Sequence, residues 1–194
     1  MEEKDRENKE EKVEKKANKT KNIRHTIVEY LTTAVVTICV VFFVYEVVII
    51  NAYIPSESME NTLMTGDRII GNRLAYKLGN DPERFDVVIF DAPDNQPGYY
   101  IKRIIGLPGE KVTIKNGKVY INDNPEPLDD SFIMEEMDEE DEMTFEVPEN
   151  SYFMLGDNRN SSNDSRRWEY PYVPKEDIVA KASFRYWKGF KWVK

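Results

Sequence analysis

Histidine and cysteine are almost missing from this chain, and their scarcity limits the chemistry that it can perform. Among its 194 residues there is one His and one Cys. A disulfide within the chain and a zinc site built from His and Cys are therefore excluded. The Ser-His-Asp and Cys-His arrangements of many hydrolases are removed as well. Any nucleophilic catalysis here must depend on another kind of base.

An excess of basic residues is also missing. The chain has 27 Lys and Arg against 36 Asp and Glu, a formal charge of -9 at pH 7. Proteins that bind nucleic acid usually carry a basic stripe that displaces counterions, so this composition argues against that class. The acidity is local, because residues 129–149 contain eleven acids and no base. We interpret this segment as an acidic surface excursion.

Large apolar residues are scarce at the start of the chain and then become abundant. Residues 1–24 are dominated by Lys, Glu and Asn, and such a segment buries too little surface to offset its ordering entropy. We predict a disordered tail there. Residues 30–50 are almost entirely apolar, with Glu46 as the only charge. This run spans roughly 30 Å as a helix, the thickness of a hydrocarbon core, so residues 25–51 are predicted to form a transmembrane anchor.

Basic residues cluster before that anchor and indicate its orientation. Residues 12–24 hold six bases and one acid, and no comparable cluster follows directly after the span. The positive-inside rule then predicts a cytoplasmic tail, a single pass through the cell membrane, and an extracytoplasmic domain over residues 52–194. A cleavable signal peptide fits less well, because the run is long and no small-x-small site follows Ile50.

Turn residues and short apolar runs alternate after the anchor. Asn116-Gly117 separates two alternating runs and is the strongest short signal for a β-hairpin, since a type I′ turn needs φ > 0 at both central positions. The other runs are separated by Pro, Gly and Asn. Together they predict a mainly β domain, a β-sandwich or partly open barrel. The predicted strands cover residues 68–72, 86–90, 99–105, 111–115, 118–121, 144–147, 152–155 and 182–187.

A serine and a lysine are the candidates for catalysis. Ser56 and Ser58 follow Pro55, and a serine hydroxyl becomes a strong nucleophile only when a base removes its proton. The predicted orientation leaves His25 on the cytoplasmic side, so lysine is the available substitute. Lys102 lies in an alternating run whose apolar face could lower its pKa from about 10.4 by roughly two to three units. Taken alone, the serines could mark a turn and the lysine a strand edge.

A polar loop supplies a third group of candidates. Residues 156–166 carry too much charge for a core segment, and in isolation they are equally consistent with a surface loop. Asp164 and Arg166 can pair within this loop, and Ser162 can hydrogen-bond a neighbouring amine.

The serine segment, the lysine segment and the polar loop together resemble one family, the type I signal peptidases. These are membrane-anchored Ser-Lys endopeptidases that release secreted proteins from their signal peptides. The resemblance is to the single-anchor bacterial form and covers about residues 54–187. Asn160 replaces an Asp that is usual in the family, and Ala180 replaces a usual Gly. The matching blocks are P-S-E-S-M-E-N-T-L at 55–63, G-D-R-I at 66–69, Y-I-K-R-I-I-G-L-P-G at 100–109, and G-D-N-R with S-N-D-S-R within 156–166.

The resemblance implies a role for each matching residue. Ser58 would be the nucleophile and Lys102 the general base. The Ser56 hydroxyl and the Ser58 backbone N–H would stabilise the oxyanion, and Ser162 would orient the Lys102 amine. Two charged pairs would support the site, and five residues would line shallow pockets for small side chains at two alternate positions of an extended peptide. The pairs are Arg103 with Asp157 and Asp164 with Arg166, and the pocket residues are Ile54, Met59, Leu63, Tyr100 and Ile101.

The resemblance also implies partners and leaves alternatives. It implies no cofactor and no metal, and as partners the signal peptides of secreted preproteins, the lipid bilayer and nearby translocation machinery. A catalytically inactive anchored adaptor that binds signal peptides is the main alternative, although both Ser58 and Lys102 are present. A self-cleaving Ser-Lys regulator would need a DNA-binding domain in place of residues 1–50. Metal-dependent hydrolysis through residues 129–149 lacks the ordered acid spacing of a calcium loop.

Overall fold

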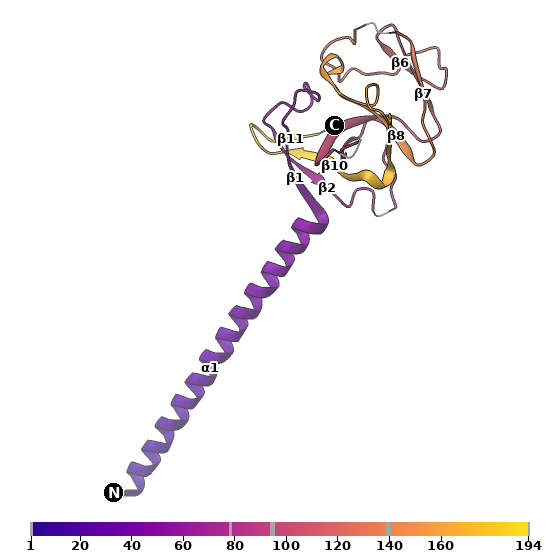
Figure 1. The fold of residues 1–194 in the computed structure, drawn as a ribbon. Coiled ribbons are helices and arrows are strands. Elements are labelled where there is room, and N and C mark those ends of the chain that lie inside the picture. The colour runs from indigo at the N-terminus through magenta and orange to yellow at the C-terminus, as the bar shows by residue number, and fades with distance from the viewer. Residues whose placement is uncertain (1, 78, 94–95, 139–140, 194) are drawn as a thin grey trace. The chain divides into compact units, whose positions relative to one another are not determined.

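The computed structural model describes residues 2–77, 79–93, 96–138 and 141–193, and among residues 2–20 the side chain of Lys19 alone. The chain divides into a helical unit that ends at Glu46 and a β unit that begins at Val47. Figure 1 shows both units, with α1 and several of the strands labelled.

The helical unit is one long helix. Helix α1 runs over Glu2–Phe43 and is followed by a π-helical turn, η1, over Val44–Val48. Within Lys21–Val48 a window of 18 residues has a mean hydropathy of 2.3 and no buried residue, so this stretch is long and apolar enough to cross a bilayer. One N-terminal apolar helix of this kind fits a membrane-anchored protein.

The beginning of α1 differs from the disordered tail predicted over residues 1–24. The helix already starts at Glu2. The segment contains no Gly or Pro, and residues of opposite charge recur four positions apart, as in Asp5 with Lys9 and Glu11 with Lys15. Such spacing favours a helix locally even where no apolar face exists to be buried.

The end of the anchor also differs from the predicted limit at Asn51. Strand β1, Ile49–Tyr53, begins inside the apolar run and pairs with β2, so that Ile50 lies opposite Gly71. Ile50 is buried in a core cluster of the β unit. A buried β-strand and the end of a membrane span are equally apolar, and composition alone does not separate them.

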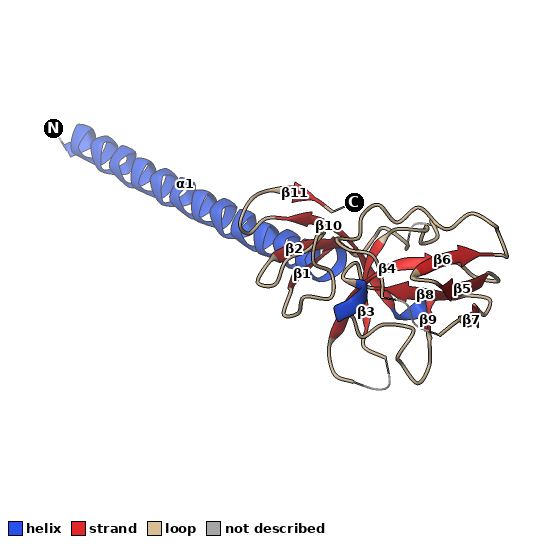
Figure 2. Cartoon of the chain, turned by 90° about the horizontal axis from the view of Figure 1, so that it is seen from above, coloured by secondary structure: helices blue, strands red, loops and turns tan. Residues whose placement is uncertain are grey.

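The β unit contains one large antiparallel sheet. Its strand order is β1-β2-β10-β3-β4-β8-β9, and β11 pairs with β10. The sheet is curled into a half-barrel, which confirms the mainly β, partly open barrel expected from the sequence (Figure 2). The strands after β1 are β2 (Arg68–Asn72), β3 (Val87–Asp91), β4 (Tyr99–Gly106), β8 (Ser151–Leu155), β9 (Tyr172–Pro174), β10 (Ile178–Arg185) and β11 (Lys191–Trp192).

A second sheet contains three strands. Strands β5 (Lys111–Lys115) and β6 (Lys118–Ile121) form the predicted hairpin, and β7 (Met143–Glu146) pairs with the other edge of β5. Asn116 and Gly117 have φ of 49° and 69°, as a type I′ turn requires. Two single-turn 3₁₀ helices, η2 (Arg159–Ser161) and η3 (Lys175–Asp177), complete the elements.

Strand β4 contributes to all three hydrophobic clusters of the β unit. Ile101 packs against the first cluster, Ile105 belongs to the second, and Ile104 belongs to the third. Lys102 lies within this strand and is 4% exposed. Lys102 is therefore buried on a strand whose apolar residues reach all three clusters.

The acidic segment is not simply the surface excursion predicted over residues 129–149. Its last part forms β7, and Met137 and Val147 are both 4% exposed in the second cluster. The carboxylates obscured this in the sequence, because acids outnumber the apolar residues in the segment. The segment uses those apolar residues to pack while most of its acids remain exposed.

Candidate active site

Ser58 and Lys102, predicted to act together, are in direct contact. Ser58 lies in the loop between β1 and β2, and Lys102 lies in β4. The Lys102 Nζ donates a hydrogen bond to the Ser58 Oγ at 2.5 Å. Ser58 is 7% exposed, so little water competes for this bond. The same geometry allows a neutral amine to accept the serine proton.

Burial makes the Lys102 amine a usable base. Desolvation lowers the pKa of Lys102 from 10.5 to about 8, and the positive charge of Arg166 acts in the same direction. The carboxylates of Asp164 and Asp157 raise this pKa and partly oppose the effect of burial. A base whose pKa lies near the working pH is well suited to proton transfer.

The loop that carries Ser58 is fixed by backbone contacts. The Met59 carbonyl accepts hydrogen bonds from the N–H groups of Thr62 and Leu63. The N–H of Asn158 donates to the Ser58 carbonyl at 3.1 Å, and its side-chain amide donates to the Glu57 carbonyl at 3.2 Å. The polar loop 156–166 is therefore bonded directly to the residues on which the nucleophile sits.

The predicted pair of Arg103 and Asp157 forms a buried, bidentate ion pair. The Arg103 Nε and Nη2 lie 2.8 and 2.6 Å from the two Asp157 carboxylate oxygens. Thr62 joins this pair, since its hydroxyl donates to Asp157 and accepts from Arg103. Removing one partner of such a pair costs about 3–5 kcal/mol, because the other charge stays buried.

The second predicted pair, Asp164 with Arg166, is bidentate too. The Arg166 Nε and Nη2 lie 2.8 and 2.9 Å from the Asp164 carboxylate. Asp164 also accepts the N–H of Gly156 at 3.1 Å. These bonds connect the two ends of the polar loop, Gly156 and Arg166, through the Asp164 carboxylate.

The two predicted helper serines differ in their contacts. The Ser56 and Ser58 hydroxyl oxygens are 3.4 Å apart, so Ser56 lies beside the candidate nucleophile. The Ser162 Oγ is buried and has no hydrogen-bond partner among the described residues. It faces Gly156, where a Cβ would stand 2.2 Å from this oxygen. Its predicted bond to the Lys102 amine is not formed in this structure.

A cavity of about 440 Å³ opens beside Ser58 and Lys102. Four of the five residues predicted to contact substrate line it, namely Ile54, Met59, Tyr100 and Ile101. Leu63 does not, and this expectation is corrected. Its side chain is fully buried in the first hydrophobic cluster, because the turn after Met59 directs it into the core.

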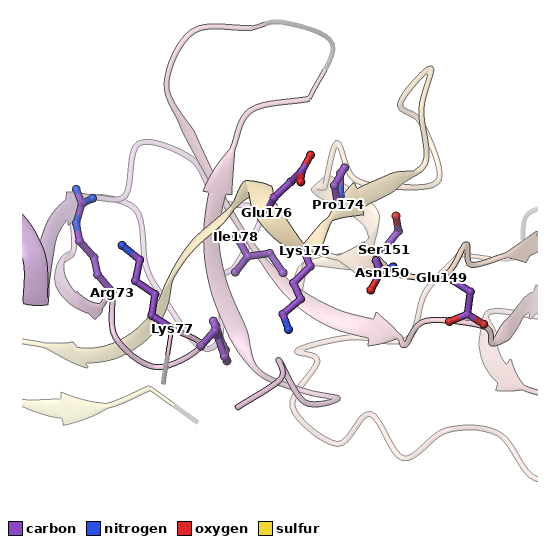
Figure 3. A pocket seen from close by; sticks show the side chains of 10 residues that line it. Arg73, Lys77, Glu149, Asn150, Ser151, Pro174, Lys175, Glu176 and Ile178 are labelled. Atoms are coloured by element: carbon purple, nitrogen blue, oxygen red, sulfur yellow. The ribbon is translucent and has the colours of Figure 1, made fainter. Parts of the chain in front are cut away.

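A second cavity of about 600 Å³ lies away from these residues and is lined mainly by polar and charged side chains (Figure 3). Arg73 and Lys77 lie at the opposite side of this cavity from Ser151 (Figure 3). Lys175 forms an ion pair with Asp81. This cavity therefore offers no serine and lysine in contact, and we place the candidate active site at the first one.

Several contact residues were not identified from the sequence. Thr62 stood inside a matching block without an assigned role, and Asn158 and Gly156 stood in the polar loop in the same way. Phe132 gave no signal, because a lone aromatic residue in an acidic run is typical of a surface loop. Its ring centroid lies 4.2 Å from the Arg103 Cζ.

Comparison with known proteins points in the same direction as this geometry. A family model described as "Signal peptidase, peptidase S26" matches residues 27–187. The chain is 42% identical over 140 residues to a probable signal peptidase I-2 of Synechocystis sp., covering 70% of this chain and 62% of that protein. It is 32% identical over 180 residues to signal peptidase IB of Staphylococcus aureus, covering 85% and 92% of the two chains. A crystal structure of a signal peptidase I from Enterococcus faecalis is 30% identical, covers 54% of this chain and 98% of that one, and gives a TM-score of 0.46.

Proposed function

Because the chain belongs to the signal peptidase family, peptidase S26, we propose that it is a membrane-anchored serine endopeptidase that removes N-terminal signal peptides from secreted preproteins. Ser58 is the proposed nucleophile and Lys102 the proposed general base. The observation that carries this proposal is the 2.5 Å hydrogen bond between a buried lysine amine and a serine hydroxyl.

The proposed reaction proceeds through an acyl-enzyme. The neutral Lys102 amine takes the Ser58 proton while the Ser58 Oγ attacks the scissile carbonyl carbon. The resulting ammonium returns the proton to the leaving nitrogen, and the peptide bond breaks. The amine then takes one proton from water, whose oxygen attacks the ester carbon. The bond between the Ser58 Oγ and this carbon breaks, and the signal peptide leaves with a new carboxyl group that releases its proton to solvent. Lys102 finally returns the proton to Ser58.

The oxyanion of each tetrahedral intermediate needs donors close to Ser58. We assign this role to the Ser58 backbone N–H and the Ser56 hydroxyl, since the Ser56 oxygen is 3.4 Å from the Ser58 oxygen. Preorganised donors at this position commonly contribute a factor of about 10² to 10³ in kcat.

The cavity supports binding of an extended peptide. Ile54, Met59 and Ile101 give it apolar walls, and Tyr100 adds an aromatic one. Alternate residues of an extended chain point to the same side, so two small side chains separated by one residue would enter together. We therefore propose cleavage after small-x-small sites.

The position of the enzyme in the cell is part of the proposal. The basic residues before the apolar helix support a cytoplasmic N-terminus and an extracytoplasmic β unit in the cell membrane. Partners would be the signal peptides, the bilayer and the translocation machinery from which preproteins emerge.

A cleavage assay with the full chain in detergent micelles tests this proposal. A signal peptide with Ala at both small positions should be cut once, directly after the second Ala, as mass spectrometry of the products would show. The control peptide carries Phe at both positions and should stay intact. An intact Ala peptide that nevertheless binds the protein would favour the alternative, a catalytically inactive anchored adaptor.

The rate should depend on pH through Lys102. Only the neutral amine is a base, so kcat/KM should rise about tenfold per unit at lower pH and level off above about 8, the pKa to which burial lowers Lys102. Initial rates of peptide cleavage between pH 5 and 10 measure this limb. The control is the affinity for the peptide over the same pH range, which should not change. A limb near 10.4 would mean that Lys102 is hydrated in the working enzyme.

A further inference from the structure

The acidic segment that the family resemblance did not explain contacts the residues around Ser58 and Lys102, here called the dyad. Residues 129–138, here called the acidic strap, place the ring of Phe132 against two buried guanidinium groups. The Arg103 Cζ lies 4.2 Å and the Arg159 Cζ 5.8 Å from the ring centroid. Phe85 contacts the same ring edge-on at 5.5 Å. Desolvated contacts between a cation and an aromatic face are the strong ones of their kind.

Asp130 of the strap pairs with a buried cation. Its carboxylate accepts from the Arg159 Nη1 at 3.1 Å, and the Arg159 side chain is fully buried. The Arg159 Nη2 has no hydrogen-bond partner among the described residues. Arg159 in turn donates to the Gly156 carbonyl at 3.1 Å and accepts from Arg166 at 2.6 Å. The strap thereby acts on the arginine that fixes the turn of the polar loop.

Among the described residues, each of the three buried arginines of this region pairs with a carboxylate. Asp157 pairs with Arg103, and Asp164 pairs with Arg166. Asp130 supplies the third carboxylate for the third buried arginine, Arg159. Without Asp130, the buried Arg159 guanidinium would lose the carboxylate with which it pairs among the described residues.

Asn160 holds the strap in place. Its side-chain carbonyl accepts the N–H of Asp138 at 2.9 Å, and its amide donates to the Glu136 carbonyl at 3.1 Å and to the Glu135 carboxylate at 3.3 Å. An aspartate could neither donate these two bonds nor avoid repulsion from Glu135. The departure from the family pattern at position 160 therefore matches the presence of the strap.

The strap also reaches the nucleophile loop. The side-chain amide of Asn61 donates to the Phe132 carbonyl at 2.6 Å. The strap thus bonds to the loop of Ser58, to Arg103 next to Lys102 in β4, and to the polar loop.

We propose that Phe132 and Asp130 are positioning residues that fix Arg103 and Arg159, and through them the carboxylates and the loop beside Ser58 and Lys102. This inference rests on the proposed function. No residue of the strap lines the cavity beside Ser58 and Lys102. The strap sets the rate of the chemical step by holding the Ser58 hydroxyl and the Lys102 amine in their relative positions.

Ring removal tests the contact of Phe132. In the full chain in detergent, Phe132→Leu should lower kcat about tenfold with KM unchanged, while Phe132→Tyr, which keeps the ring, should retain the wild-type rate. Met134→Ala is the matched control, because Met134 lies in the same strap and is 60% exposed. The rate is expressed per active site titrated with a serine-directed acylating reagent, so unfolded protein does not count.

Charge removal tests Asp130. Asp130→Asn removes the carboxylate that pairs with the buried Arg159 guanidinium. That guanidinium interacts with Arg166, Asp157 and Asp164, the same charges that act on Lys102, so their surroundings become more positive. The ascending limb of the pH-rate profile should therefore move to lower pH, and kcat should fall. A purely structural role would change thermal stability and leave this limb where it is.

The outcomes separate this inference from the proposed function. If Phe132→Leu and Asp130→Asn keep the wild-type kcat and pH profile, the strap has no positioning role. If Phe132→Leu does not fold, the pH profile of Asp130→Asn decides. If the wild-type chain cuts no signal peptide, the proposed function fails. The rate at which the reagent acylates Ser58, followed by intact mass in the same variants, then still tests the strap.

Discussion

Replacing Lys102 by methionine should reduce cleavage of the Ala-x-Ala signal peptide about ten-thousand-fold or more. Methionine keeps most of the buried volume but cannot accept the proton that Ser58 must lose, and the amine bonded to the Ser58 Oγ disappears. Removing one member of a nucleophile and base pair commonly costs 10⁴ to 10⁶ in kcat. Product formation by the full chain in detergent, followed by mass spectrometry, measures the loss.

Two comparisons make this result specific. Ser58→Ala and the double variant Ser58→Ala with Lys102→Met should show the same residual rate, because the two residues act as one unit. Lys118→Met is the matched control, since Lys118 is an exposed lysine of the β5-β6 hairpin. Measurable wild-type-like turnover in Lys102→Met would assign the base to another group.

Gly156→Ala should be the second most damaging single change, lowering kcat about a hundredfold or more. A Cβ at this position would stand 2.4 Å from the Ser58 carbonyl oxygen and 2.2 Å from the Ser162 Oγ. The Ser58 oxygen belongs to the backbone and accepts the Asn158 N–H, so the nucleophile loop itself must move. A misplacement of about 1 Å in a catalytic group can cost a factor of 10².

Gly106→Ala provides the contrast for that prediction. A Cβ there meets Val112 at 2.6 Å and Phe153 at 2.9 Å, a similar crowding but within the second hydrophobic cluster. It should lower the thermal midpoint while kcat per titrated active site stays close to wild type. If Gly156→Ala behaves in the same way, the contact between the polar loop and the Ser58 backbone does not control the chemistry.

The strands that the sequence predicted best are those with a local signal. Strands β2, β5 and β6 have the predicted limits, because alternation and the Asn116-Gly117 turn are properties of neighbouring residues. Strand β1 was absorbed into the predicted anchor, since its apolar residues continue the membrane run. Strands β9 and β11 have three and two residues, too few for any periodicity.

The candidate site divides in the same way. Ser58, Lys102 and the two ion pairs lie in sequence blocks that resemble one family, so the resemblance could imply them together. The contacts of Phe132 and Asp130 depend on how the strap packs against loops far away in the sequence, and no local pattern encodes that. The burial of Leu63 follows from the turn after Met59, which the motif does not reveal.

The position of Lys102 in β4 links the state of the fold to the state of the catalyst. A fraction of its amine is neutral, and so able to accept a proton, near neutral pH because burial lowers its pKa to about 8. Local opening of β4 would rehydrate the amine, restore a pKa near its ordinary value and leave it protonated. Damaged or partly unfolded molecules would then lose their activity before they unfold completely. In a protease of this construction, proteolysis stops when the packing around one lysine is lost.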